Sequence, residues 1–467
     1  MKRHGVASGT DSAKRGTIAR ADVIASTPLG EAETQGFMKA SLPPGRRTGH
    51  DEPYSYLPSL PQIRAFHSVA ESRSMSLGAI DLGRSQPAVT QAIANLEASF
   101  GVPLFLRQRS GLILTDAGLI LHNRVRRFFA ELRGAVIKCG GDRGWKASQV
   151  DVIAKRLTKS LIVALLLIDE YGSLGHAAKL LNQREAALRK AVRSLESDLE
   201  TTLFKRGAHG ISTNAQGKLL ATRLRLAVRE LEAAHEEMNA GFGIETGRIL
   251  VGAMILAGNH LLTSVVQRFT SRYPHARVSV LNATYDVLLD QLKRGAIDFA
   301  VGLQNHPTPA DNVLEQVIAE DPFVLAVRRG HPLTKRSTIN TAHLAQYDWV
   351  VARPGATRRA AFDHLFGNGP RPNAQVETHS FVTIVMLLAD SDAIAVMTQS
   401  ELILEAKLGG NLVALDVGPL ETDSRMAVTT RRGWMPTYLQ DAFAHCLHDH
   451  VPDVNGSPSA DDAWRAR

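Results

Sequence analysis

Four short or amide side chains lie together at the start of a predicted helix that we call the reading helix (85–100): Ser85, Gln86, Thr90 and Gln91. Glutamine can pair in two ways with adenine, and threonine can contact the methyl group of thymine. The N-terminus of a helix also offers free N–H groups and a positive dipole end to a phosphate. The pattern predicts a helix that enters the major groove of DNA; in the alternative interpretation these residues only cap and solvate the helix.

Two predicted helices position the reading helix. The first begins at a capping box, Ser59-Leu60-Pro61-Gln62, and continues with apolar residues at helical spacing. Ser74 can cap a second helix, which we expect to bury Leu77, Ile80 and Leu82. Ser85 can cap the reading helix, and Pro87 lies in the first turn, where its missing N–H costs nothing. The reading helix should bury Val89, Ile93 and Leu96.

A short wing and a long helix are predicted to follow. Residues 101–115 suit two strands joined by a turn at Ser110-Gly111, and a helix with one apolar side extends from Asp116 to about Arg133. A glycine-rich stretch at 140–144 then breaks the chain.

The whole unit recurs after a shift of 99 residues, which lays residues 60–134 on residues 159–233. Ser74 falls on Ser173, Leu96-Glu97 on Leu195-Glu196 and Gly118 on Gly217. The chain therefore carries two copies of one helical unit.

The second copy keeps the apolar positions but not the polar ones. Where the first copy has Ser85, Gln86, Pro87 and Thr90, the second has Arg184, Glu185, Ala186 and Arg189. A capping box of Asn182 with Glu185 predicts a helix start two residues earlier. Two interpretations stay open: a structural or auxiliary copy, or a second reader of DNA. Its basic residues could hold phosphates without selecting bases: Arg184, Arg189, Lys190 and Arg193.

The long helix of the second copy, predicted over 215–238, has leucine or valine at near-heptad spacing: Leu220, Leu224, Val228 and Leu231. This spacing is typical of a helix that pairs with another helix. We expect the long helices of the two copies to pair within one chain as a pseudo-dimer. The competing arrangement is pairing between chains.

The charge of the 467-residue chain is uneven. Residues 57–246 carry 26 Lys and Arg against 18 Asp and Glu, whereas residues 247–467 carry 20 against 22. A polyanion would therefore bind over the two copies. After Gly247 the pattern alternates between strands and helices, which predicts a parallel sheet covered by helices.

Several function classes are excluded. No apolar run approaches the roughly 18 residues of a membrane span, and the chain starts without a secretory signal, so we expect a cytoplasmic protein without membrane partners. Cys139 and Cys446 form no CxxC motif, so they indicate no metal site or disulfide framework. The histidines of 445–450 fit a solvated helix end better than a metal cluster. Because the sequence has no catalytic constellation or phosphate loop, we expect neither an enzyme nor a cofactor.

The reading helix and its surroundings resemble the winged helix-turn-helix of LysR-type transcriptional regulators. The matching residues are Ser85–Ile93, Leu96-Glu97, Gly101, Leu104-Phe105, Arg107 and Leu114–Gly118. Residues 247–450 resemble the effector-binding domain of that family, at Gly247, Val251-Gly252, Phe269, Tyr273-Pro274, Gly295–Ala300 and Arg329–Leu333.

The resemblance implies a bacterial regulator of transcription that binds double-stranded DNA and a small-molecule effector and forms a dimer or tetramer. Ser85, Gln86, Pro87, Thr90 and Gln91 would read DNA, and Arg107 and Arg109 of the wing would touch its backbone or minor groove. The effector would lie between two α/β subdomains, as in periplasmic binding proteins. The implied contact residues are Ala257, Gly258, Asn259, Gly302, Leu303, Arg353, Thr357, Ser380 and Phe381.

We thus expect a multidomain chain of two tandem winged helix-turn-helix units, mainly α, followed by an α/β effector domain. The expected parts are a disordered tail (1–56), the first unit with its linker helix (57–138), the divergent second unit (157–241), the effector domain (247–452) and a tail (453–467). The alternative function is a small-molecule receptor without specific DNA binding.

Overall fold

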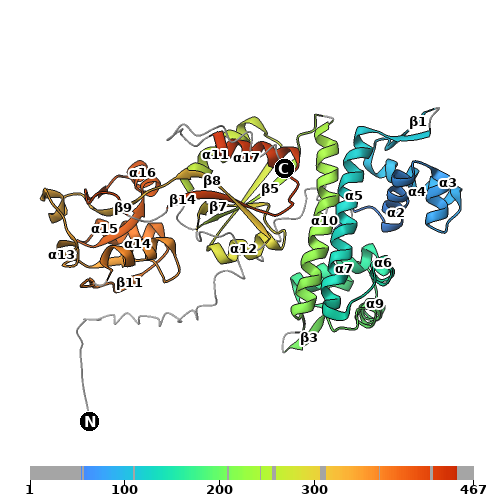
Figure 1. The fold of residues 1–467 in the computed structure, drawn as a ribbon, viewed down its shortest axis with the longest axis horizontal. Coiled ribbons are helices and arrows are strands. Elements are labelled where there is room, and N and C mark those ends of the chain that lie inside the picture. Colours follow the sequence, from blue (N-terminus) through green and yellow to red (C-terminus); the bar gives the residue numbers. More distant parts are fainter. Residues whose placement is uncertain are drawn as a thin grey trace, which may run out of the picture.

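The computed structural model describes Tyr54 and residues 57–108, 111–207, 210–241, 243–254, 259–304, 312–367, 369–420 and 424–449. Apart from Tyr54, the predicted tails 1–56 and 453–467 lie outside these residues. Two small helical units lie on one side of a pair of long helices, and two α/β lobes lie on the other side (Figure 1). Within the described part of the chain, no helix has the length and apolar character needed to cross a membrane.

The first unit has the predicted order of elements: α2 (Leu60–Ser72), α3 (Met75–Asp81), α4 (Gln86–Phe100), β1 (Phe105–Gln108), β2 (Gly111–Leu114) and α5 (Asp116–Gly140). The reading helix is α4, and its predicted core residues Val89, Ile93 and Leu96 are at most 2% exposed.

The expected burial of Leu77 and Ile80 is wrong, because these side chains are 56% and 75% exposed. The short helix α3 instead turns Gly78 and Ala79 inward. An added Cβ at Gly78 would lie 2.7 Å from Cγ2 of Val69, so the close approach of α3 to α2 requires glycine at this position.

The second unit follows the short helices η1 (Gly141–Arg143) and α6 (Ala147–Arg156), and α6 is a helix that the sequence analysis did not predict. Its elements repeat those of the first unit: α7 (Lys159–Tyr171), α8 (Leu174–Leu180), α9 (Glu185–Asp198), β3 (Phe204–Gly207), β4 (Gly210–Thr213) and α10 (Ala215–Gly241). The predicted earlier start of the third helix is wrong, since α9 begins at Glu185, the equivalent of Gln86. Asn182 has a φ of 49° and takes the left-handed turn position of Gly83, whose φ is 61°.

The long helices start in the same way in both units. Gly118 and Gly217 lie in their first turns, and an added Cβ would come within 2.1 Å and 2.0 Å of the carbonyl oxygens of Leu104 and Leu203. The repeated glycine therefore lets each long helix pack directly on the segment before its own wing.

The long helices α5 and α10 pack against each other within one chain, as predicted, and together make the most extensive helix contact of the structure. They are antiparallel, because Arg124 near the start of α5 contacts Glu237 near the end of α10, while Cys139 near the end of α5 contacts Gln216. Two ion pairs repeat across this contact: Arg124 Nη1 to Glu230 at 3.0 Å and Arg223 Nη1 to Glu131 at 2.7 Å. A shift of 99 residues relates these pairs, so the helix pair has a pseudo-twofold axis.

Two α/β lobes follow. The first contains a sheet in the order β6-β5-β7-β14-β8, in which β5 is parallel to β6 and β7 and β14 is antiparallel to β7 and β8. Its elements are β5 (Gly247–Met254), α11 (Asn259–Arg272), β6 (Ala276–Ala283), α12 (Tyr285–Lys293), β7 (Phe299–Leu303), β8 (Val313–Glu320), β14 (Arg425–Arg431) and α17 (Tyr438–Asp449).

The second lobe has a sheet in the order β11-β10-β12-β9-β13. Its elements are β9 (Phe323–Arg328), η2 (Pro332–Lys335), α13 (Thr341–Leu344), β10 (Trp349–Val351), α14 (Thr357–Phe366), β11 (Val376–Glu377), α15 (Phe381–Ala389), β12 (Ile394–Thr398), α16 (Gln399–Leu408) and β13 (Leu412–Ala414). The chain crosses between the lobes twice, from β8 to β9 and from β13 to β14. A hydrogen bond of 2.8 Å from the N–H of Asp321 to the carbonyl of Ser424 joins the two crossings.

The first lobe rests on the paired long helices through two buried arginines. Arg124 of α5, 1% exposed, donates to the carbonyl oxygens of Met435 and Pro436 at 2.9 Å and 3.0 Å, in the turn between β14 and α17. Arg229 of α10 lies 3.5 Å from the carboxylate of Asp298 in the same lobe. A movement of the first lobe would therefore change contacts made by both long helices.

The pseudo-twofold axis provides a matched test of this contact. Arg124→Ala should lower the free energy of unfolding by about 3–5 kcal/mol, because it leaves the largely buried carboxylate of Glu237 without its arginine and removes one of the two arginines paired with Glu230. Its repeat equivalent, Arg223→Ala, removes a partly exposed ion pair and should cost at most about 1 kcal/mol. Denaturant unfolding followed by circular dichroism measures both variants. Equal losses would contradict the asymmetric burial.

Candidate functional site

The reading helix presents one polar face to solvent. Its predicted contact residues are all exposed: Ser85, Gln86, Pro87, Thr90 and Gln91. Ser85 occupies the N-cap position, but its side chain makes no capping hydrogen bond. The hydroxyl and the free N–H groups of the first turn thus point to solvent at the positive end of α4, which favours an anion there.

Hydrogen bonds hold the two glutamines of this face. The hydroxyl of Ser76 donates to Oε1 of Gln86 at 3.1 Å, and Nε2 of Gln91 donates to Oδ1 of Asn95 at 2.8 Å. The sequence analysis missed Ser76 and Asn95, although Asn95 lies four residues after Gln91, on the same face of a helix. The two glutamine side chains are therefore oriented before any contact with DNA.

Of the two wing arginines, Arg107 is exposed on β1, opposite Leu112 of β2. Arg109 lies outside the described residues. Gly111 of β2 lies near the end of α2, since an added Cβ on it would be 4.0 Å from the carbonyl oxygen of Arg73.

The corresponding face of the second unit is charged. Glu185 forms an ion pair with Arg189 one turn along α9, and its Oε2 lies 2.9 Å from the position of an added Cβ on Gly175. Gly175 is the repeat equivalent of Ser76, so a carboxylate occupies the space from which Ser76 holds Gln86. The face of α9 offers cations and one carboxylate where α4 offers amides and hydroxyls.

A cavity of about 280 Å³ lies between the two lobes. The first lobe contributes the ends of β5 and β7 and the start of α12, and the second contributes the segment from β10 into α14 together with His379. The lining residues are Met254, Ala283, Thr284, Tyr285, Asp286, Leu303, Ala352, Arg353, Pro354, Gly355, Ala356, Thr357, Arg358 and His379.

The second lobe brings two arginines to this cavity, whereas the first lobe brings the carboxylate of Asp286. Arg353 is exposed, and Arg358 is 7% exposed and paired with the buried carboxylate of Glu401. Burial raises the pKa of Glu401 although Arg358 acts to lower it. Within the described residues, Nη1 of Arg358 is buried without a hydrogen-bond partner. Such a group is costly to leave unpaired, and it belongs to an arginine that lines the cavity.

His379 lies beside these arginines. Its pKa is lowered, first by burial and then by Arg353 and Arg358, so its imidazole is neutral near pH 7. The N-terminus of α14 opens onto the same cavity, with Ala356 at its N-cap position and no side-chain cap. The second lobe therefore presents positive groups and neutral donors together.

The predicted effector contacts are only partly gathered here. Leu303, Arg353 and Thr357 line the cavity. Ser380 caps α15 through a hydrogen bond of 3.2 Å from the N–H of Thr383, and Phe381 begins that helix next to His379. Ala257 and Gly258 lie outside the described residues, as does the side chain of Asn259.

The sequence analysis missed Thr284, Tyr285, Asp286 and His379. The first three directly follow β6, which is parallel to β5, and ligands of such sheets lie beyond the carboxyl ends of the strands. The strand order could therefore have identified these three residues. No pattern in the sequence around His379 indicated that it would line the cavity.

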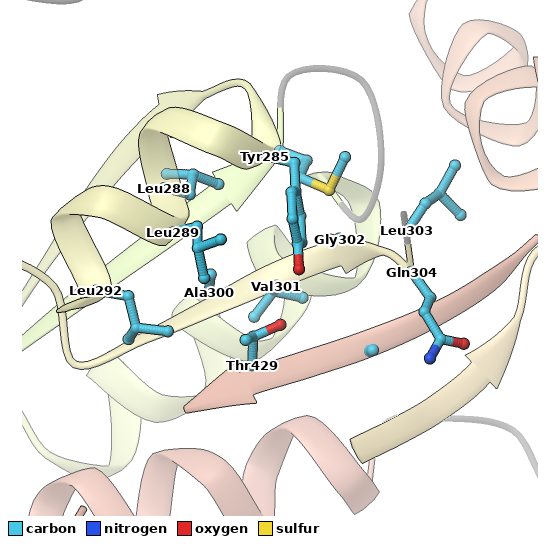
Figure 2. A pocket seen from close by; sticks show the side chains of 12 residues that line it. Tyr285, Leu288, Leu289, Leu292, Ala300, Val301, Gly302, Leu303, Gln304 and Thr429 are labelled. Carbon is cyan, nitrogen blue, oxygen red and sulfur yellow. The ribbon is translucent and has the colours of Figure 1, made fainter. Parts of the chain in front are cut away.

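A small apolar pocket adjoins the cavity and shares Met254, Tyr285 and Leu303 with it. Figure 2 shows the leucines of α12 above β7, with the ring of Tyr285 pointing across that strand. The hydroxyl of Tyr285 donates to Oε1 of Glu315 at 2.7 Å, and burial together with Glu315 raises the tyrosine pKa. Gly302, a predicted contact, lines this pocket, where an added Cβ would lie 2.4 Å from Cγ of Met254.

Two family models match the helical units and the α/β lobes. The family described as bacterial regulatory helix-turn-helix protein, lysR family, matches residues 60–119 and again 160–218. The family described as LysR substrate binding domain matches residues 243–452.

Curated relatives include the HTH-type transcriptional regulator GalR of Pseudomonas putida, 31% identical over 406 residues, which are 85% of this chain and 98% of that protein. The HTH-type transcriptional regulator GbpR of Azospirillum brasilense is 27% identical over 52% of this chain and 72% of its own length.

Among solved structures, a full-length OxyR from Pseudomonas aeruginosa matches with a TM-score of 0.48 and 18% identity, over 64% of this chain and 94% of that one. CbnR, a LysR family transcriptional regulator, matches with a TM-score of 0.44 and 17% identity, over 63% of this chain and 99% of that one.

The family models cover the reading helix, its wing and both lobes, and a relative of nearly the same extent is a transcriptional regulator. Members of this family regulate transcription rather than catalyse reactions, and they bind DNA and small-molecule effectors. The chain belongs to the LysR family of bacterial transcriptional regulators.

Proposed function

We propose that this regulator reads its operator with the first of two tandem winged helix-turn-helix units and holds it with the second. The observation that carries the proposal is the difference between two faces on one scaffold. The face of α4 presents hydroxyl and amide groups, whereas that of α9 presents charges. Amides select bases, while arginine and lysine contacts to phosphates position a protein without selecting sequence.

In this proposal Ser85, Gln86, Thr90 and Gln91 contact bases or nearby phosphates, Pro87 starts the helix, and Arg107 and Arg109 contact the DNA backbone. Gln86 and Gln91 support it because Ser76 and Asn95 orient their amides. A preoriented amide loses less conformational entropy when it binds.

The second unit then acts as an electrostatic anchor. Lys190 and Arg193 are exposed on α9, and Arg189 is tied to Glu185. Glu185 would repel a phosphate at the helix N-terminus, where Gln86 of the first unit would not. We therefore favour an auxiliary copy over a second reader of bases.

We place the domain boundaries at 57–138, 157–241 and 247–452, with tails at 1–56 and 453–467. Because α5 and α10 pair within the chain, one molecule presents two helix-turn-helix units, as a dimer does in family members with one unit each. Homodimers or tetramers would then form through other surfaces. A cytoplasmic location follows from the DNA target.

Substitutions on the exposed faces of α4 and α9 separate base reading from phosphate anchoring. Gln86→Ala and Thr90→Ala should each weaken operator binding by about 1–3 kcal/mol for every base pairing that the substitution removes, with little effect on random DNA. Fluorescence anisotropy with the promoter of the neighbouring gene and with a scrambled duplex measures both affinities.

On the exposed face of α9 in the second unit, Lys190→Ala and Arg193→Ala should weaken binding to both duplexes alike. Each should reduce the slope of log affinity against log salt by about 1. Unchanged operator affinity of Gln86→Ala and Thr90→Ala, or an absence of sequence preference in the α9 variants, would contradict the assigned roles.

The effector is proposed to be a small anion that binds between the lobes, in the manner of periplasmic binding proteins. Arg358, whose Nη1 is buried without a partner in the described part of the chain, lies with the exposed Arg353 and the N-terminus of α14 on one wall of the cavity. Across from them the first lobe contributes Thr284, Tyr285 and the carboxylate of Asp286, which suit hydroxyl groups of the effector. The remaining predicted contacts belong to this proposal: Ala257, Gly258, Asn259, Gly302, Leu303, Thr357, Ser380 and Phe381.

An anionic effector would draw the lobes together, because its charge contacts the second lobe and its hydroxyl groups contact the first. The first lobe contacts Arg124 and Arg229 of the long helices. Closure would therefore change how the two units sit on DNA, by a shift between populated states.

A panel of small carboxylates and sugar acids tests the cavity by thermal unfolding. A ligand present at 100 times its Kd should stabilise the wild type by about 2.7 kcal/mol. Arg353→Ala should weaken its binding by at least about tenfold, as expected when about 1.4 kcal/mol is removed. Arg336→Ala, an exposed arginine outside the cavity, should bind like the wild type. Equal binding by both variants, or stabilisation by neutral sugars alone, would reject an anionic effector.

The second candidate function is a small-molecule receptor without specific DNA binding, favoured by the cavity alone. It predicts ligand binding together with equal affinity for operator and scrambled DNA. Salt-sensitive, sequence-dependent binding to promoter DNA would exclude it.

A further inference from the structure

Two histidines and a glutamate gather on the first unit, away from the reading face and from the cavity. His67 and Glu71 lie one turn apart on α2, and His122 lies on α5. One potential ligand atom from each residue lies within 4.8 Å of the other two. Nε2 of His122 is 3.0 Å from Oε1 of Glu71. Within the described residues this is the one such group of three.

The polar atoms of this cluster are incompletely satisfied. Nδ1 of His67 is buried, and no hydrogen-bond partner for it occurs in the described part of the chain. The ring of His67 packs between His122 and Phe129, with centroid distances of 5.8 Å and 5.2 Å. A buried nitrogen without a partner costs free energy, so packing alone does not account for a histidine here.

The second unit shows how the fold fills the same position without histidine. The repeat equivalents of His67, Glu71 and His122 are Leu166, Glu170 and Ala221. Leu166 of α7 and Ala221 of α10 are 0% and 2% exposed. In the second unit, two buried apolar side chains therefore occupy the positions of the two histidines. The scaffold does not need the two histidines, which points to another role for them.

We propose that His67, Glu71 and His122 bind a divalent transition metal of the zinc type. Imidazole nitrogens and a carboxylate oxygen are typical ligands of this ion, and three protein ligands leave a fourth position for water. Tetrahedral zinc–nitrogen bonds of about 2.0–2.1 Å place neighbouring ligand atoms about 3.3 Å apart, so the three side chains must draw together from separations of up to 4.8 Å. Glu71 is half exposed, so it can make this adjustment, and the site is open to the ion.

One neighbouring cation, Arg126, would repel a bound metal ion but leaves the site accessible. Nε of Arg126 lies 3.9 Å from Oε1 of Glu71, and the Arg126 side chain is 64% exposed. It can turn into solvent, where its charge is screened.

The metal would join α2 to α5, and so fix the orientation of the first unit on the long helices. Metal binding itself does not depend on the proposed function; its effect on DNA binding rests on that function. The consequence is a regulator whose operator affinity changes with the metal ion.

The test uses the full chain, freed of metal by a chelator and titrated with Zn²⁺ by calorimetry, or with Co²⁺ by visible absorption. The wild type should take up one ion at this site. His67→Leu and His122→Ala, which reproduce residues of the second unit, should each weaken this binding by at least about 100-fold. That loss should exceed the roughly 10–100-fold effect of removing an outer-shell partner. The partly exposed Glu71→Gln should weaken it as well.

His448→Ala is the matched control, because His445 and His448 form the other histidine pair that the sequence singles out, at the end of α17. It should leave the tight site intact. Circular dichroism spectra equal to wild type establish that the variants fold, and Glu71→Gln tests the site even if a core substitution unfolds the unit. Tight binding that survives His67→Leu or His122→Ala, no tight binding by the wild type, or its loss in His448→Ala would each overturn the proposal. Metal binding without any change in operator affinity would overturn only the regulatory consequence.

Discussion

The antiparallel pairing of α5 and α10 within one chain is the contact on which the rest of the structure depends. Each long helix begins directly after the wing of its own unit, so antiparallel pairing sends the two units to opposite ends (Figure 1). Because both helices belong to one chain, the pairing is unimolecular and needs no second molecule. The separation between α4 and α9 is thus built into the monomer.

This pairing is symmetric in its ion pairs but not in its surroundings. Arg124 and Arg223 are repeat equivalents and contact equivalent glutamates, yet Arg124 is covered by the first α/β lobe whereas Arg223 is partly exposed. A true homodimer would present both arginines to equivalent surroundings. With one pair of lobes for two units, the chain has lost that equivalence. The two units also differ in residue type, because the face of α4 is polar and uncharged whereas the face of α9 is charged.

Much of the architecture followed from local patterns. The caps at Ser74 and Ser173, the glycines at Gly118 and Gly217 and the buried stripe of α4 each act over a few residues, so the sequence indicated the helices and both wings. The errors arose where local rules compete. Leu77 and Ile80 are apolar yet exposed, because the close approach of α3 to α2 is set by Gly78. Asn182 offered a cap but instead takes a left-handed turn, as Gly83 does.

The sequence by itself determined that the scaffold is duplicated. It also determined that only the first copy has amides and hydroxyls at the positions of Ser85, Gln86 and Thr90, because both properties depend only on residue type and spacing. Only the tertiary structure decided which side chains from distant segments meet. It joined Arg358 to Glu401 in the wall of the cavity, placed Arg124 against the carbonyl groups of Met435 and Pro436, and brought His122 to His67. Such contacts depend on how helices and lobes pack, and packing is set by the sum of many weak interactions rather than by any local pattern.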